Sequence, residues 1–185
     1  MTSNKDYFAG LVAGATVQKS SRYFERGTYL VEVDNAKMFM NRKRQPRAAV
    51  ECTILESSNN NLPRSTSVSW IVSLDSDAGP STIKSWIFSM FGSPESEITS
   101  AAVSEIFVGE DENRVSSTNG FKAIVTAYEK PTRSGGVFTK CEWRRFHDGD
   151  PLPDFAELRR TSPGLPVPTL PSGQEVDLND DPIPF

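Results

Sequence analysis

The apolar residues between positions 27 and 146 change their spacing twice, and this change restricts the folds open to the chain. In the first part apolar and polar residues alternate, as in strands with one buried face. In the middle part apolar residues recur three and four positions apart, as in helices, and the last part alternates again. The predicted strands cover residues 27–39, 48–55, 68–72, 121–128 and 136–146, and the predicted helices cover residues 81–91 and 94–107. We therefore expect a mainly β fold with a helical insert between the third and fourth strands.

The alternation also predicts which face of each early strand is buried. Side chains two residues apart point to the same side of a strand, so each run of alternate apolar residues marks one face. We expect these faces to meet in one core. Their members are Tyr29, Val31 and Val33 in the first strand, Val50, Cys52 and Ile54 in the second, and Val68, Trp70 and Val72 in the third.

Three strands, a helical insert and two further strands are the connectivity of an OB-fold. This five-stranded, partly open barrel binds oligonucleotides through the loops that join its strands 1–2 and 4–5. Both of these loops are basic here. The first carries Arg42, Lys43, Arg44 and Arg47, and the second has Lys130, Arg133, Lys140, Arg144 and Arg145 on or beside it. Paired basic loops next to aromatic residues favour binding of nucleic acid.

Four aromatic residues adjoin these loops and are candidates for stacking on bases. Phe39 lies beside the first basic cluster, and Tyr128 directly precedes the second loop. Phe138 alternates with charged residues, whereas Trp143 alternates with Cys141 and Val137, which leaves it open between a core and a stacking role. The predicted nucleic-acid-binding residues are Phe39, Arg42, Lys43, Arg44, Arg47, Tyr128, Lys130, Arg133, Phe138, Lys140, Trp143 and Arg144.

The net charge of −4 comes from the end of the chain. All 20 Lys and Arg residues lie at or before Arg160, whereas four of the 24 acidic residues lie after it, so residues 1–160 sum to zero. The acidic overall charge therefore does not argue against a basic binding surface on the body.

The last residues, Asp180 to Phe185, combine two carboxylates with a short apolar hook. A terminal aromatic side chain beside the free α-carboxylate suits an apolar pocket rimmed by Lys or Arg. The prolines keep this segment extended before binding. The predicted partner-binding residues are Asp177, Asp180, Asp181, Pro182, Ile183, Pro184 and Phe185.

This ending resembles the C-terminal tip of bacterial and phage single-stranded DNA-binding proteins, an Asp run followed by Ile-Pro-Phe. Pro182 stands where the bacterial form usually has another Asp. The resemblance to the phage type extends over most of residues 25–185. It implies that the barrel coats and protects single-stranded DNA during replication, recombination and repair, and that the tip recruits proteins of those processes. The longer helical insert and the short Pro-rich linker differ from the bacterial form, so a bacterial-style tetramer is not implied and homo-oligomerisation stays open.

The domain organisation follows from these assignments. Residues 1–26 form an N-terminal arm, residues 27–148 the OB-fold domain, and residues 149–185 a Pro-rich linker with a disordered, acidic partner-binding tail. Within the linker, residues 155–160 are expected to form one helical turn on the body.

Other classes of function lack support in the sequence. His147 is the one histidine, Cys52 and Cys141 form no CxxC pair, and no catalytic fingerprint occurs, so we expect no enzyme activity, metal site or cofactor. The absence of a basic n-region with an apolar h-region, and of a long apolar run, predicts a cytoplasmic protein with free thiols, in a bacterial cell or phage-infected host. The alternative function is a replisome or recombination adaptor whose OB domain binds protein, with weak, duplex or RNA binding.

Overall fold

The computed structural model describes residues 22–76, 78–109, 113–131 and 136–161. In this part of the chain one sheet runs in the order β1-β4-β3-β2-β6-β7, with β5 beside β2. The strands β1 and β4 pair in parallel, as do β2 and β5, and the other pairs are antiparallel. The strands are β1 (Arg22–Tyr23), β2 (Gly27–Met40), β3 (Pro46–Ser57), β4 (Ser67–Ser73), β5 (Val108–Gly109), β6 (Lys122–Pro131) and β7 (Val137–Phe146).

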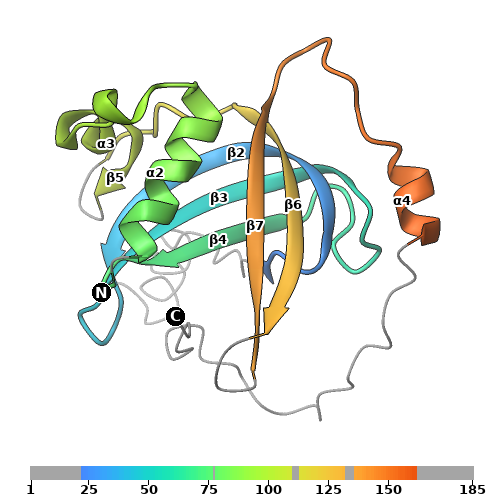
Figure 1. Ribbon diagram of the computed structural model, residues 1–185, viewed down its shortest axis with the longest axis horizontal. Coiled ribbons are helices and arrows are strands. Elements are labelled where there is room, and N and C mark those ends of the chain that lie inside the picture. Colours follow the sequence, from blue (N-terminus) through green and yellow to red (C-terminus); the bar gives the residue numbers. More distant parts are fainter. Residues whose placement is uncertain (1–21, 77, 110–112, 132–135, 162–185) are drawn as a thin grey trace, which may run out of the picture.

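The sheet curls into a half-barrel because its long central strand, β2, changes direction (Figure 1). The first part of β2, from Gly27 to Glu32, pairs with β6 on one side, whereas pairing with β3 continues on the other side to Met40. The register with β3 shifts between Leu30 and Val31 and again after Val33. Such irregularities bend a strand and increase its twist. The mainly β fold predicted from the alternation is confirmed, and its shape is compatible with a β barrel.

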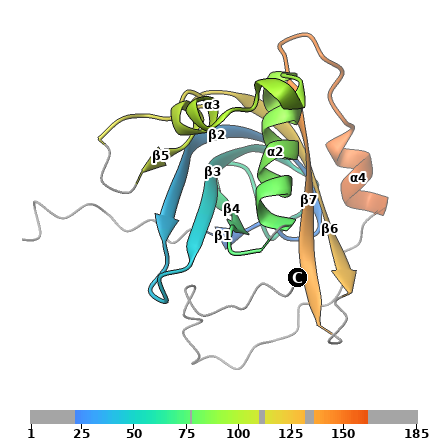
Figure 2. The same ribbon diagram turned by 60° about the vertical axis from the view of Figure 1, so that its left-hand side comes forward.

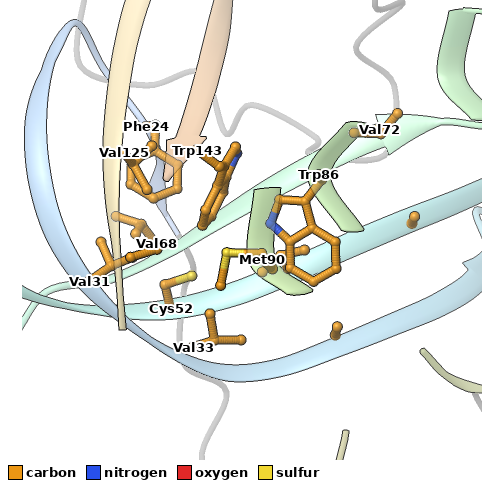
Figure 3. Close-up of a cluster of buried hydrophobic side chains, with 14 of the residues drawn as sticks. Phe24, Val31, Val33, Cys52, Val68, Val72, Trp86, Met90, Val125 and Trp143 are labelled. Carbon is orange, nitrogen blue, oxygen red and sulfur yellow. The ribbon is translucent and has the colours of Figure 1, made fainter. Parts of the chain in front are cut away.

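The core lies on the concave side of this sheet, between the strands and helix α2 (Figure 3). The faces predicted for the first two strands are confirmed, since Tyr29, Val31, Val33, Val50, Cys52 and Ile54 are all buried. In the third, Val68 and Val72 are buried, and the half-buried Trp70 packs against the same core. Alternation thus identified the inner face of all three strands.

Helix α2 (Ala78–Phe91) covers the open side of the half-barrel. It begins three residues earlier than the predicted 81–91 and buries Ile83, Trp86, Ile87 and Met90 against the sheet. Its first turn touches the end of β4 so closely that a Cβ on Gly79 would stand 1.7 Å from the carbonyl oxygen of Ser73. Only glycine fits at that position without a shift of the backbone.

The second predicted helix, over residues 94–107, is wrong as a continuous element. The structure has a short 3-10 helix, η1 (Glu95–Glu97), followed by helix α3 (Ser100–Ile106). The backbone of Thr99 is extended, and its hydroxyl accepts a hydrogen bond from the Ala102 amide at 3.3 Å. A threonine that satisfies a free amide in this way begins a new helix, so Thr99 is the cap of α3.

All three tryptophans of the chain meet where β4 and β7 approach each other. The ring centroids of Trp70 in β4 and Trp143 in β7 are 5.3 Å apart, and Trp86 of α2 lies 6.3 and 6.1 Å from them. The Trp86 and Trp143 rings are almost perpendicular, and Figure 3 shows the Trp86 nitrogen on the side of its ring nearest Trp143. Within the described residues this buried nitrogen has no hydrogen-bond acceptor.

The outer surface of the sheet carries a second, smaller apolar cluster. Phe155 of helix α4 (Phe155–Thr161) packs there on Leu30 of β2 and Ile124 of β6. The Arg159 side chain fixes the helix further, because its Nε donates to the Ser57 carbonyl at 2.8 Å. The helical turn expected over residues 155–160 is therefore confirmed as α4, resting on the body.

The predicted N-terminal arm, residues 1–26, overlaps the folded domain. Arg22 and Tyr23 form β1 against β4, and Phe24 is buried in the main core. Residues 1–21 and the tail residues 162–185 lie outside the described residues.

Candidate nucleic-acid interface

Most of the predicted binding residues of the second loop share one face of the β6–β7 hairpin. Val125 and Ala127 of β6 point into the core, so the residues between them and beyond, Thr126, Tyr128 and Lys130, point outward. In the antiparallel register Lys130 stands opposite Phe138, Tyr128 opposite Lys140, and Thr126 opposite Glu142. The structure thus brings together on the outward face Tyr128, Lys130, Phe138, Lys140 and Arg144.

Tyr128 is the centre of this outward face. Its ring is half-buried, and the ammonium groups of Lys130 and Lys140 lie 5.9 and 5.8 Å from the ring centroid. A cation at this distance is attracted by the negative face of an aromatic ring. The arrangement provides an aromatic surface with two positive charges next to it.

Glu142 completes the group, and the sequence analysis did not include it. The Tyr128 hydroxyl donates a hydrogen bond to Glu142 Oε1, and the Lys140 ammonium lies 3.6 Å from the same oxygen. The hydroxyl, followed by the Lys140 charge, holds the pKa of Glu142 below its ordinary value, and contact with Tyr128, followed by that with Glu142, raises the pKa of Lys140. The signal for Glu142 was its alternation with Lys140 and Arg144, which places all three on one face.

Phe138 and Arg144 flank this centre. Phe138 is half-buried, next to the tip of the hairpin and directly across from Lys130. Arg144 is exposed near the other end of the strand, and its guanidinium lies 3.9 Å from an Asp150 carboxylate oxygen. Arg133 lies outside the described residues.

The assignment of Trp143 to the interface is wrong. It stands one position from Glu142, so its side chain points to the opposite face, where it is only 9% exposed. Its ring packs edge-on against Phe24 at 5.8 Å and beside the other two tryptophans. A ring enclosed in this way cannot receive a base.

The tip of the β2–β3 hairpin presents the first basic cluster. Asn41 and Gln45 close the turn through backbone and side-chain hydrogen bonds, and Arg44 takes a left-handed conformation with φ of 58°. The side chains of Arg42, Lys43 and Arg44 are exposed there. The tight turn therefore holds three positive side chains at the end of two long strands.

The assignment of Arg47 to the interface is also wrong. Arg47 is 8% exposed, and its guanidinium donates to Asp75 Oδ1 at 3.2 Å, to Gln45 Oε1 at 3.0 Å and to the Ser73 hydroxyl. The same Asp75 carboxylate has a lowered pKa, mainly because the Ser73 hydroxyl donates to it. Arg47 thus fastens the base of the hairpin to the end of β4, a pairing that only the sheet register brings about.

Phe39 lies beside Arg47 on the outer face of the sheet, as the register of β2 and β3 places it. The Lys37 ammonium is 5.9 Å from the Phe39 ring and also forms an ion pair of 2.6 Å with Glu51. Lys37 was not among the predicted residues, although it alternates with Phe39 on the same strand.

The two hairpins extend from the same end of the molecule. In Figure 1 the β2–β3 turn, the end of β6 and the start of β7 all lie at the lower side, and Figure 2 shows the same after a turn about the vertical axis. The half-barrel separates them horizontally in both views. The exposed cations of both loops are therefore presented at one end of the fold.

Other parts of the described chain provide weaker candidates for a functional site. A shallow hollow is lined by Ser104, Glu105, Asn113 and Arg114, but the Arg114 guanidinium is engaged with carbonyl oxygens at the end of α3. Within the described residues no group of His, Cys, Asp and Glu side chains is placed to hold a metal ion. Among the described helices, none is long and apolar enough to span a membrane. Cys52 and Cys141 are free thiols.

Comparison with known proteins adds no assignment: no protein-family model matches the chain, and a search of curated proteins finds no match.

Proposed function

We propose that the chain is a non-catalytic single-stranded DNA-binding protein that protects transient single strands in replication, recombination and repair. The observation that carries this proposal is the Tyr128 ring with the Lys130 and Lys140 ammonium groups beside it, on an outward strand face that also holds Phe138. Rings of this kind stack on bases, while the adjacent cations contact the phosphates. Bases paired inside a duplex cannot present a free face to such a ring, so the arrangement favours single strands.

The proposed architecture is an OB-fold with its helical insert between the third and fourth strands of the barrel. Supporting it, the order β4-β3-β2-β6-β7 keeps the first barrel strand, β2, in the middle of the sheet, and α2 and α3 follow β4 in the chain. The loops that bind oligonucleotides in that fold correspond here to the β2–β3 and β6–β7 hairpins. These are the two hairpins that carry the exposed cations.

The direct test is a fluorescence-anisotropy titration with single-stranded DNA, duplex DNA and RNA oligomers at several salt concentrations. We expect single strands to bind best, with affinity falling steeply as salt increases, by about 0.7 log units per log unit of salt for each phosphate contact. The variant neutralised at Arg42, Lys43, Arg44, Lys130 and Arg133 should bind far more weakly, and similarly for all sequences. Arg64→Gln, at a side chain 72% exposed, is the control for removal of a remote charge.

Equal binding of single strands by the neutralised variant and the wild type would contradict the proposed interface. Failure of the wild type to bind any of the three nucleic acids would instead favour an adaptor whose barrel binds protein. Preference for RNA would change the ligand but keep the face, whereas preference for duplex DNA would contradict stacking on Tyr128.

The second half of the proposed function concerns the acidic tail, which lies outside the described residues. We propose that residues 177–185 recruit replication, recombination or repair proteins in the cytoplasm of a bacterial cell or phage-infected host. Deleting 177–185 should raise DNA affinity at low salt, because a tethered acidic segment competes for the basic face. The same deletion should abolish recruitment, measured by pull-down from host lysate, whereas Phe185→Ala should weaken recruitment but leave DNA affinity nearly unchanged. Equal recovery of partners with and without the Phe185 ring would refute the role of the tail.

A further inference from the structure

Glu142 places a negative charge in the middle of a face that otherwise offers aromatic rings and cations. The carboxylate accepts from the Tyr128 hydroxyl and lies 3.6 Å from the Lys140 ammonium. Its side chain is 59% exposed, so nothing in the packing requires an acid there. The inference that follows rests on the proposed function and concerns what this carboxylate does when a nucleic acid binds.

The two donors that Glu142 occupies are those that a phosphodiester would use. A phosphodiester and a carboxylate each carry one negative charge and accept hydrogen bonds through two oxygens. The Tyr128 hydroxyl has one hydrogen to donate, and the single positive charge of Lys140 cannot fully neutralise both anions at once. Because the ion pair is exposed and weak, the carboxylate can rotate away without unfolding the hairpin.

We propose that Glu142 is an internal competitor for the phosphate that Lys140 would bind, and that it limits how long a single strand stays on the protein. Displacement by phosphate exchanges one anion for another at Lys140. Because one anion replaces another, the electrostatic free energy of binding at Lys140 changes little. Stacking on Tyr128 must therefore hold the strand. When a phosphate leaves for a moment, the carboxylate returns and opposes its rebinding.

The test uses Glu142→Gln with Glu129→Gln as its matched control. The amide of Glu142→Gln keeps an acceptor for the Tyr128 hydroxyl, so the pose of the ring is preserved while the charge is removed. Glu129 is exposed, adjoins Tyr128 in the same strand and points to the opposite face, and its replacement removes the same charge. The probe is fluorescein-labelled oligothymidylate, followed by anisotropy at several salt concentrations and by stopped-flow dissociation.

We expect Glu142→Gln to slow dissociation up to about fivefold, the upper range for release from an exposed ion pair. The slope of log affinity against log salt concentration should become steeper by about 0.7, because Lys140 then neutralises a phosphate, which releases a cation from the strand, without leaving an unpaired carboxylate behind. Glu129→Gln should change mainly the association rate at low salt, as remote charges do. In a Lys140→Gln background the effect of Glu142→Gln should disappear, because the two residues then no longer interact.

Equal dissociation rates for Glu142→Gln and the wild type would overturn the inference while the proposed function stands. The same follows if Glu129→Gln slows dissociation equally, or if Glu142→Gln acts undiminished without Lys140. Absence of binding by the wild type and both variants would overturn the inference and the proposed function together.

Discussion

The two faces of the β6–β7 hairpin carry aromatic residues in opposite environments, one buried and one partly exposed. On the inner face Trp143 packs against Phe24 and two other tryptophans. On the outer face, one strand away, Tyr128 stays half-exposed between two lysines and bonds to a glutamate. Both rings lie in the same pair of strands, a few positions apart, and differ in the side of the sheet to which they point. This side determines their roles. The chemical type of the ring does not decide it.

The largest effect should come from the inner face. Trp143→Ala removes a buried ring from the tryptophan cluster and should lower the free energy of unfolding by about 3–5 kcal/mol. Urea denaturation measures this loss, with Phe138→Ala as the outer-face comparison. A Phe138→Ala variant that is destabilised as much as Trp143→Ala would end the distinction between the faces.

The next effect concerns the outer ring. Tyr128→Ala should weaken binding of single-stranded DNA by about 1–3 kcal/mol, the range for loss of one stacking ring, with little change in the urea midpoint. Tyr128→Phe keeps the ring and should retain most of the affinity. If Tyr128→Phe and Tyr128→Ala lose affinity equally in anisotropy titrations, the hydroxyl is the important group and stacking is not.

A smaller effect should separate the two lysines of that face. Lys130→Gln should reduce the slope of log affinity against log salt concentration by about 0.7. This is the value for one phosphate contact with a single strand. Lys140→Gln should reduce it less, because the Glu142 carboxylate already neutralises Lys140. Titrations at several salt concentrations give both slopes, and a larger change for Lys140→Gln would contradict the ordering.

The last prediction compares the alkylation rates of thiols on the two faces. It involves the smallest effect on stability and affinity. Burial raises the pKa of Cys141, on the inner face, to about 12, so almost no thiolate is present at pH 8 and alkylation should be slow. Thr126→Cys places an exposed thiol on the outer face, where iodoacetamide should react readily. Unfolding in urea lowers the Cys141 pKa towards its ordinary value and should remove the difference, as mass spectrometry can show.

Local pattern in the sequence was enough to predict the strands and their buried faces. A single period of two residues located the inner residues of β2 and β3, because neighbouring side chains on a strand must point to opposite sides. The same rule places Phe138 on one face with Lys140 and Arg144, the charged residues with which it alternates, as the register of β7 has it.

The wrong assignments of Arg47 and Trp143 depend on contacts between distant segments, whereas the helix predicted over residues 94–107 is broken by a local contact. Arg47 reads as one more cation of its cluster, and only the pairing of β3 with β4 brings Ser73 and Asp75 to it. Trp143 was open between two roles because its neighbours Cys141 and Val137 do not reveal how the sheet closes. The single helix predicted over residues 94–107 is interrupted at Thr99. Its hydroxyl accepts a hydrogen bond from the Ala102 amide, and this bond competes with continuation of the helix.

The meeting of Trp70, Trp86 and Trp143 has a consequence for kinetics and for spectroscopy. These residues are far apart in the chain, so the closure of β7 against β4 costs much loop entropy and should come late in folding. Because the cluster contains every tryptophan of the protein, intrinsic fluorescence excited at the indole band reports this one late event. Because Trp86 and Trp143 are enclosed, a change in that signal on adding an oligonucleotide would report a shift of the seam between β4 and β7 or a contact with the half-buried Trp70, and not a base on either enclosed indole.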